Sequence, residues 1–438
     1  MFSKQLLRRQ NLWTSLAILF AYSLILTRCL QITNIDDLFG GGGRTQIRGD
    51  AFTEKYAHNA MRYFYDHGFL KTSLLPNTYY NETGPADFSN AEIYKHYPSL
   101  PEVLGGIYAK TFNSIDLRVL RIIPILLSIL WLFVIYLLLK EIFTEKKYIK
   151  TTLILIVLSN YFIAWADNIH KFMYEELLKT SSILLLIWYY KKKIIPLLFF
   201  PCFFLLSLIL SNISLDAMPT TGLLIFAISL FYTKRIINLP SFLALSTYFL
   251  GIYLHVLQMF FLYGSWEVTI NDIKTTFLFR TIGEAENTLV EVNLSNLLQH
   301  IFFHNINRLE RYFVIPGWGM ITMLLWAYRS KRINLRERSL WNYLLFGSIA
   351  AGVIWSLLMS QHAMIHVWVA RNYGIFYLIA GGYLITEYFT FLKENYSALE
   401  TKLKTLNILF VTYLVLMFLT QHVYELYFKY GFLFEYHG

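Results

Sequence analysis

The stretch LRVLRIIPILLSILWLFVIYLLLKEIF, residues 117–143, carries no charged side chain between Arg121 and Lys140. An α-helix of about 20 apolar residues is long enough to cross the hydrocarbon core of a bilayer. A helix also satisfies its own backbone hydrogen bonds, which lipid cannot do. This stretch therefore predicts a membrane-spanning helix.

The composition extends this prediction to the whole chain. Of 438 residues, 56% are hydrophobic, 18% aromatic and only 15% charged, whereas a soluble domain has about 25% charged residues. The net charge of +10 does not indicate a nucleic-acid partner, because the basic residues lie between apolar segments. The two cysteines, Cys29 and Cys202, lie within apolar segments, so no disulfide framework is expected.

Apolar runs predict an all-α polytopic membrane protein with about eleven transmembrane helices in a single domain, residues 1–438. The predicted spans are 11–31, 118–139, 151–167, 175–191, 194–212, 218–233, 239–263, 311–328, 339–360, 372–391 and 405–425.

The basic residues of the connections predict the orientation. Lys and Arg accumulate on the cytoplasmic side of membrane proteins. With eleven spans, six basic clusters fall on one side, which places the N-terminus inside and the C-terminus outside. After the N-terminal cluster, these are Lys140 with Lys146, Lys147 and Lys150; Lys191 to Lys193; Lys234 with Arg235; Arg329 to Arg338; and Lys393 with Lys402 and Lys404.

Two long connections, 32–117 and 264–310, then lie outside the cytoplasm. In the first, aromatic residues recur at three- and four-residue spacing between positions 50 and 67, which predicts a helix lying along the membrane interface. A second helix is predicted over 101–111, where Gly105 and Gly106 allow a close approach.

Polar groups at the outer ends of spans are candidate site residues, because burying them in lipid is costly. Asp50 precedes the first outer helix, where a carboxylate is either a helix cap or a catalytic base. Lys95, His96 and Tyr97 form a second group, which suits either a phosphate contact or an interface anchor.

Two further candidate groups come from short outer turns. The turn WADNIHKFMYEELLK, residues 165–179, holds Asp167, His170, Glu175 and Glu176, which could form a metal or acceptor site, although their spacing matches no established metal motif. The late turn holds His362, His366 and Arg371. These residues fit a metal pair, an interface anchor or, preferably, a phosphate contact through Arg371 and a histidine.

The order of these features resembles the GT-C class of membrane glycosyltransferases. It is most similar to the branch of dolichyl-phosphate-mannose protein mannosyltransferases and lipid A aminoarabinose transferases. HYPSLPEVLGGIYAKTFNSIDLRVLRIIPILLSIL, residues 96–130, resembles that branch's THYPPLP…RL…LLS stretch. His366, Trp368 and Arg371 resemble its late outer turn containing histidine.

The resemblance implies a donor with a sugar on a polyprenyl phosphate, used on the extracytoplasmic face of the plasma membrane, and a lipid, glycan or protein acceptor. It implies that the first-loop acid activates the acceptor hydroxyl; Asp50 matches that position, with Asp36 and Asp37 as rivals. The second acidic position resembles Asp167 or the pair Glu175 and Glu176.

The chemistry of such a donor suits this set of residues. A polyprenyl phosphate is a competent leaving group, so one carboxylate base suffices for an inverting transfer. Lys95, His366 and Arg371, with His96 and Tyr97 nearby, would neutralise the departing phosphate. His170 and His362 are expected in auxiliary or acceptor-binding roles. No cofactor is expected; a divalent metal is compatible with the chemistry, but no motif indicates one.

Three other functions fit a polytopic protein. A transporter or lipid-linked glycan flippase would place ionisable residues near the midplane, whereas here they gather at the outer ends. A polymerase of lipid-linked units would concentrate arginines in its outer loops, and 264–310 holds only Lys274, Arg280 and Arg308 as basic residues besides histidine. A noncatalytic membrane assembly factor is the third alternative.

Overall fold

The computed structural model describes residues 2–35, 51–78, 97–235, 237–281, 293–309, 317–365 and 367–395 as continuous stretches. Isolated described positions are 80, 93, 95, 312, 313, 315 and a few between 401 and 416. Within this described part, the only β pairing is one isolated bridge between Asn77 and Ile93. The predicted all-α class is confirmed there.

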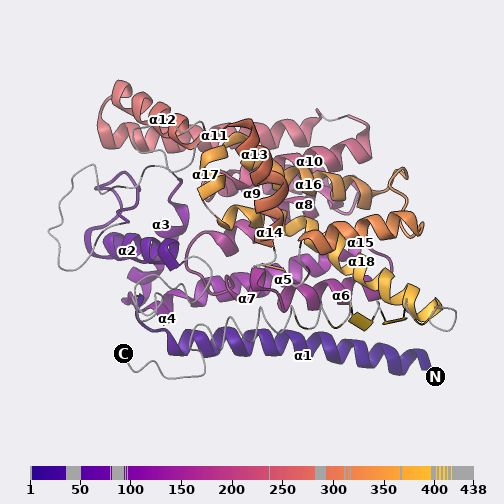
Figure 1. The fold of residues 1–438 in the computed structure, drawn as a ribbon. Helices are drawn as coiled ribbons and strands as arrows, with labels where there is room; N and C mark the ends of the chain where they lie inside the picture. Colours follow the sequence, from indigo (N-terminus) through magenta and orange to yellow (C-terminus); the bar gives the residue numbers. More distant parts are fainter. Residues whose placement is uncertain are drawn as a thin grey trace.

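The long helices form one bundle in which they run roughly alongside one another (Figure 1). They are α1 (Phe2–Gln31), α5 (Ile122–Ile142), α6 (Lys146–Val157), α8 (Phe172–Tyr190), α9 (Pro196–Ser211), α10 (Ala217–Thr233), α11 (Leu239–Tyr263), α15 (Gly317–Arg329), α16 (Leu340–Leu358) and α18 (Gly374–Asn395).

Shorter helices cover the ends of the bundle. They are α2 (Ala51–His67), α3 (Leu100–Phe112), α4 (Leu117–Leu120), α7 (Asn160–Ile163), α12 (Trp266–Thr281), α13 (Leu294–Gln299), the π-helix η2 (His300–His304), α14 (Asn305–Arg308), α17 (Ser360–Ile365) and the 3₁₀-helix η4 (Val367–Tyr373). Figure 1 shows α2 and α3 at the end of the bundle where α1 terminates.

Within the described residues, five helical segments are long and apolar enough to cross a membrane: Leu12–Gln31, Leu117–Ile142, Leu239–Tyr263, Leu340–Leu358 and Val369–Asn395. Two shorter apolar helices, Pro196–Ser211 and Ala217–Thr233, also match predicted spans. The protein is therefore a multi-pass membrane protein. The predicted span 405–425 falls almost entirely outside the described residues, so the count of eleven and the orientation stay predictions.

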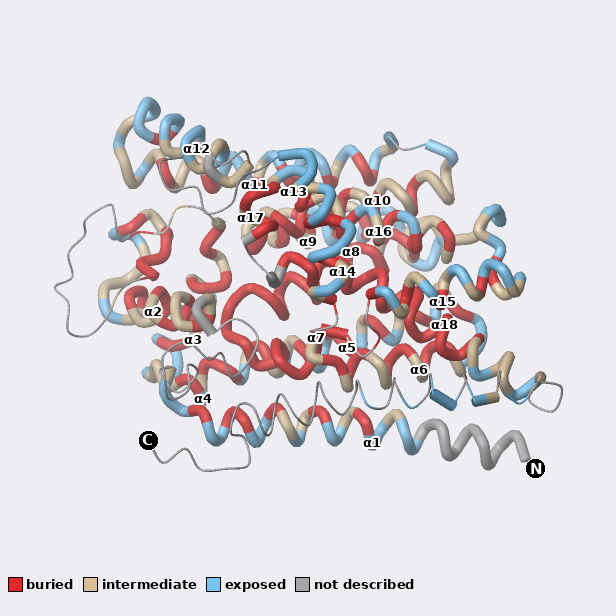
Figure 2. Tube along the Cα trace, in the orientation of Figure 1, coloured by how far each residue is buried: buried red, intermediate tan, exposed pale blue. Residues whose placement is uncertain are grey.

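The interior of the bundle is closely packed. Pairs of packed helices include α10 with α16, α5 with α8, and α6 with α18. Figure 2 shows the buried positions gathered in the centre, while α1 and α12 carry exposed positions along their outward sides. Along α1, Ala17, Ala21, Ile25 and Cys29 form the buried stripe, as expected for a helix that contacts the bundle on one face only.

Two predicted spans differ in the structure. The span 151–167 is broken, because α6 ends at Val157 and Ser159 adopts an extended backbone before α7. The Ser159 hydroxyl donates to the carbonyl of Ile156, an alternative to continuing the helix. The span 311–328 is shorter than predicted: α15 begins at Gly317, directly after Pro316 in the sequence.

The two predicted helices of the first long connection are confirmed as α2 and α3, and their placement along the membrane interface stays a prediction. α2 packs against α3, and Tyr63 and Phe64 of α2 are buried at 1% and 0% exposure. A Cβ at Gly106 would lie 2.8 Å from Cβ of Phe64. The two glycines of α3 thus provide the predicted close approach.

Candidate functional site

A cavity of about 930 Å³ lies between the outer-loop segments and the helices α10, α11, α12, α16 and α17. Its long arm is apolar. Residues of α10 and α11 that line this arm include Met218, Leu223, Phe226, Leu245, Phe249 and Ile252. An apolar cavity with a few convergent polar groups is the usual form of a ligand site.

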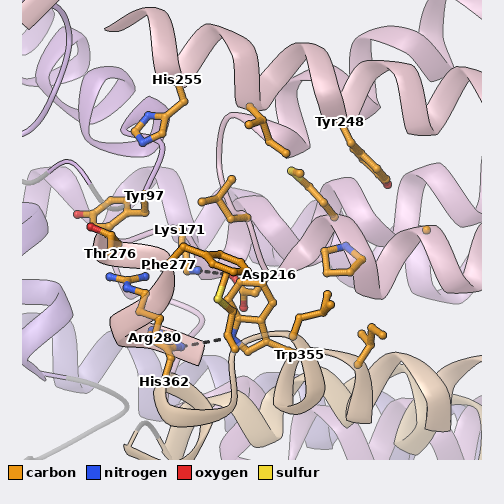
Figure 3. A pocket seen from close by; sticks show the side chains of 18 of the residues that line it. Tyr97, Lys171, Asp216, Tyr248, His255, Thr276, Phe277, Arg280, Trp355 and His362 are labelled. Atoms are coloured by element: carbon orange, nitrogen blue, oxygen red, sulfur yellow. Dashed lines mark hydrogen bonds and ion pairs between the residues drawn. The ribbon is translucent and has the colours of Figure 1, made fainter. Parts of the chain in front are cut away.

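The other end of the cavity is polar and mainly basic. Figure 3 shows Tyr97, Arg280 and His362 on one side of the cavity and Tyr248 on another. The polar lining residues at this end are Thr53, Tyr56, Lys95, Tyr97, His170, Lys171, Asp216, Arg280 and His362. They come from six separate parts of the sequence.

Lys95 is held at the cavity through both its backbone and its side chain. Nε2 of His255, on α11, donates to the Lys95 carbonyl at 2.9 Å. The Lys95 ammonium lies 4.8 Å from the centre of the Tyr263 ring, a favourable cation–π distance. These contacts connect the first outer loop to α11.

Lys171 and Asp216 form a buried ion pair in the cavity wall. The Lys171 ammonium donates to Asp216 Oδ1 at 2.7 Å and to the Ser214 hydroxyl at 3.0 Å, and Ser214 also donates to Asp216. Burial acts to raise the pKa of Asp216, but the Lys171 charge and the two hydrogen bonds outweigh burial and lower the pKa to about 2. Asp216 is therefore ionised and offsets the charge of Lys171.

His170 and His362 each have one ring nitrogen engaged. His170 Nδ1 lies 2.7 Å from Oε1 of Glu102, a fully buried residue of α3. His362 Nδ1 accepts a hydrogen bond from Nε1 of Trp355 at 3.3 Å. Both rings line the cavity.

Asp167 lies in a second cluster, away from the residues that line the cavity. Its carboxylate accepts from Arg28 of α1 and from the Cys29 thiol, and Arg121 approaches it at 4.0 Å. Arg121 Nε also lies 3.5 Å from Glu54 of α2. Arg28, Glu54, Arg121 and Asp167 are all 0–1% exposed, so this cluster connects the outer ends of α1, α2 and α4 with the turn after α7.

Glu175, Glu176 and Arg371 lie in a third cluster, inside the bundle. Lys179 is 2.9 Å from Glu176 and 3.7 Å from Glu175, and Arg371 is 3.9 Å from Glu176. The Arg371 guanidinium lies 4.4 Å from the Trp165 ring centre. This network joins α8 to η4, and its two cations balance the charges of its two carboxylates.

The structure brings together four of the predicted site residues at the cavity: Lys95, Tyr97, His170 and His362. It places Asp167, Glu175, Glu176 and Arg371 in buried ion clusters instead, and their assignment to catalysis or substrate contact stays a prediction. Asp50, His96 and His366 lie outside the described residues, as do the rivals Asp36 and Asp37. Thr53 of α2, three positions after Asp50, lines the cavity.

Four charged residues at or beside the cavity were not among the predicted site residues: Glu102, Lys171, Asp216 and Arg280. Asp216 and Lys171 each lie in a short predicted outer turn. The rule that polar groups at the outer ends of spans are candidate site residues therefore applies to them as it does to His170. Arg280 was considered only for its charge within the predicted outer connection 264–310. Glu102 follows a proline at the start of α3, where an acidic residue is expected simply to complement the helix dipole.

Comparisons with known proteins give limited information. No protein-family model matches the chain, and no curated protein matches it significantly. The structure is similar to that of the Archaeoglobus fulgidus oligosaccharyltransferase in the apo form, at 15% identity and a TM-score of 0.49. It is also similar to the oligosaccharyltransferase AglB of that organism in complex with an inhibitory peptide and a dolichol-phosphate, at 12% identity and a TM-score of 0.43.

Both matches cover 94% of this chain and 55% of the archaeal chain, so the protein spans about half the length of the proteins it matches. Identity and TM-scores this low do not assign the chain to a family. The functional argument therefore depends on the cavity and on the residues themselves.

Proposed function

We propose that the protein is a membrane glycosyltransferase of GT-C type. It transfers a sugar from a polyprenyl-phosphate donor to a hydroxyl of a lipid, glycan or protein acceptor, on the extracytoplasmic face of the plasma membrane. The observation that carries this proposal is the cavity, which joins a long apolar arm to a basic end within one space. A lipid phosphate has the same two parts.

Each part of the donor has matching residues. The polyprenyl chain occupies the apolar arm between α10 and α11, where Leu245, Phe249 and Ile252 replace contacts with lipid tails. The phosphate lies at the basic end, near Lys95 and Arg280. Cations placed there stabilise the negative charge that develops as the phosphate leaves.

The transfer is an inverting displacement. The acceptor oxygen attacks C1 of the sugar, the bond from C1 to the phosphate oxygen breaks, and its electron pair stays on the phosphate. The hydroxyl proton passes to a first-loop carboxylate, which we assign to Asp50. The donor already carries the activated sugar, so transfer requires no separate cofactor.

The test is genetic, because the sugar is unknown. Envelope glycans and lipids from a strain lacking the gene are analysed by mass spectrometry, and the strain is complemented with wild-type protein, Asp50→Asn or Asp66→Asn. Asp66 is an exposed acid of α2 and is not among the residues that line the cavity. We expect one sugar to be lost in the deletion strain and restored by wild type and Asp66→Asn, but not by Asp50→Asn.

Two results would contradict the proposal at different points. An unchanged glycan and lipid profile in the deletion strain would exclude glycosyl transfer. Full restoration by Asp50→Asn would leave the transferase intact but remove Asp50 as the base.

A further inference from the structure

Glu102 and His170 form a buried carboxylate–imidazole pair at the wall of the cavity. Glu102 is 0% exposed and His170 is 4% exposed, and 68 positions separate them in the sequence. Their contact, 2.7 Å between Oε1 and Nδ1, joins α3 to the turn before α8. Because this contact is short and buried, it fixes the orientation of the imidazole ring.

The ring is held on its other sides as well. Tyr97 and Phe172 pack edge-on against it, with ring centres at 5.4 Å and 5.5 Å. The backbone N–H of His170 donates to Oδ1 of Asn168 at 2.9 Å. In the described part of the chain, Nε2 of His170 has no hydrogen-bond partner, although the residue lines the cavity. Nε2 is thus the nitrogen left for a ligand.

The Glu102 carboxylate is a buried group whose charge the imidazole can balance. Oε2 of Glu102 is buried without a hydrogen-bond partner among the described residues. An ionised carboxylate in such surroundings is costly unless a positive charge balances it. A proton on His170 makes the pair neutral overall and turns Nε2 into a hydrogen-bond donor that faces the cavity.

The groups around His170 favour an anion at this position. Those that line the same end of the cavity are Tyr97, Lys95, Lys171, Asp216, Arg280 and His362, and His255 approaches from α11. Asp216 is the one ionised acid among these described residues, and it is bound to Lys171. The remaining charge is positive, which suits phosphate rather than a neutral hydroxyl.

We propose that His170, protonated and oriented by Glu102, donates a hydrogen bond from Nε2 to a phosphate oxygen of the lipid-linked donor. This inference rests on the proposed function and assigns the group that holds its leaving phosphate. When C1 separates from the phosphate oxygen, the electron pair stays on the phosphate and the acceptor proton goes to Asp50. His170 keeps its proton and stabilises the added charge. His170 is a catalytic residue in this scheme, and Glu102 is a positioning residue.

The test compares the binding of two probes, a long-chain polyprenyl phosphate and the corresponding polyprenol, to purified full-length protein in nanodiscs. Affinities at one pH are measured for wild type, His170→Gln and Glu102→Gln. The readout is the ratio of wild-type to variant affinity for each probe.

We expect wild type to bind the phosphate probe roughly tenfold or more tightly than His170→Gln, since a charge-assisted hydrogen bond is lost. Glu102→Gln should also weaken binding of the phosphate probe, because the imidazole loses the carboxylate that orients it. Polyprenol should bind all three proteins equally, which also shows that the variants fold.

His304→Gln is the matched control, because His304 is an exposed histidine that is not among the residues lining the cavity. This variant should bind both probes as wild type does. Wild-type affinity of His170→Gln for the phosphate probe would overturn the role of His170, and a Glu102→Gln protein identical to wild type would overturn the role of the pair. Equal wild-type affinity for polyprenol and polyprenyl phosphate would overturn the phosphate site and the proposed donor together.

Discussion

Asp216 and Lys171 show how a single contact sets the charge of the cavity wall. The two residues are 45 positions apart, both are less than 10% exposed, and Ser214 binds each of them. Breaking a buried ion pair by removing one partner is strongly destabilising, whereas replacing both partners by uncharged groups often is not.

This pair predicts a particular loss of stability in acid. The pKa of Asp216 is lowered from an ordinary value of 3.8 to about 2. The pair therefore stabilises the fold fully above about pH 4, and the contribution disappears as the pH falls from there through about 2. Thermal unfolding in detergent between these values should show this loss in wild type and not in Asp216→Asn.

At neutral pH, Asp216→Asn should lower the free energy of unfolding by roughly 3 to 5 kcal/mol. The double variant Lys171→Met, Asp216→Asn should recover part of this loss, because it removes the ammonium that the single variant leaves without its carboxylate. If wild type and Asp216→Asn lost the same amount of stability in acid, the stabilising contribution assigned to the ion pair would be refuted.

Among the elements, α2 and α3 form the unit that supports the outer wall of the cavity. α2 contributes Thr53 and Tyr56 to the lining, and α3 contributes Glu102, which orients His170. Their close packing depends on Gly105 and Gly106, where an added Cβ would meet Met61 and Phe64 of α2.

Gly106→Ala should therefore force α3 away from α2 and destabilise the protein by about 1 to 3 kcal/mol, despite the better helix propensity of alanine. Gly381→Ala is the control, since the nearest atoms to a Cβ at Gly381, on α18, are 4.0 Å away. Thermal unfolding of the two variants in the same detergent makes the comparison. Equal stability of both variants and wild type would show that α2 and α3 are not in tight contact.

At the scale of the whole molecule, the basic clusters predict which loops face the cytoplasm. The structure is compatible with this arrangement: α2 and α3 lie at the end where α1 terminates, and the first helix begins at the opposite end (Figure 1). Labelling of single cysteines by an impermeant maleimide in intact cells would test it. The background protein carries Cys29→Ser and Cys202→Ser, and the serine hydroxyl at position 29 can donate to Asp167 in place of the thiol.

Cysteines introduced at Leu70 and Trp266, both exposed and in the two predicted outer loops, should be labelled in intact cells. A cysteine at Lys192, in a predicted cytoplasmic turn, should be labelled only after the cells are permeabilised. The reverse pattern would invert the topology and place the cavity on the cytoplasmic side.

The sequence by itself determined the helical membrane character and most helix positions, because apolar length and Lys and Arg bias are local properties of the chain. It also located α2, α3 and four residues of the cavity. It failed where a helix breaks at Ser159, since the apolar run continues through the break. It did not show that α2 packs on α3, since periodicity does not identify the contacting surface.

Only the tertiary structure decided which polar residues meet. Glu102 pairs with His170, Lys171 with Asp216, and Asp167 with Arg28 across 139 positions. Each of these side chains stands in an outer loop, a short turn or the end of a helix, and the sequence gives its charge but not its partner. A buried charge is stabilised by whichever opposite charge the packed helices bring within about 4 Å, and that distance is a property of the folded bundle alone.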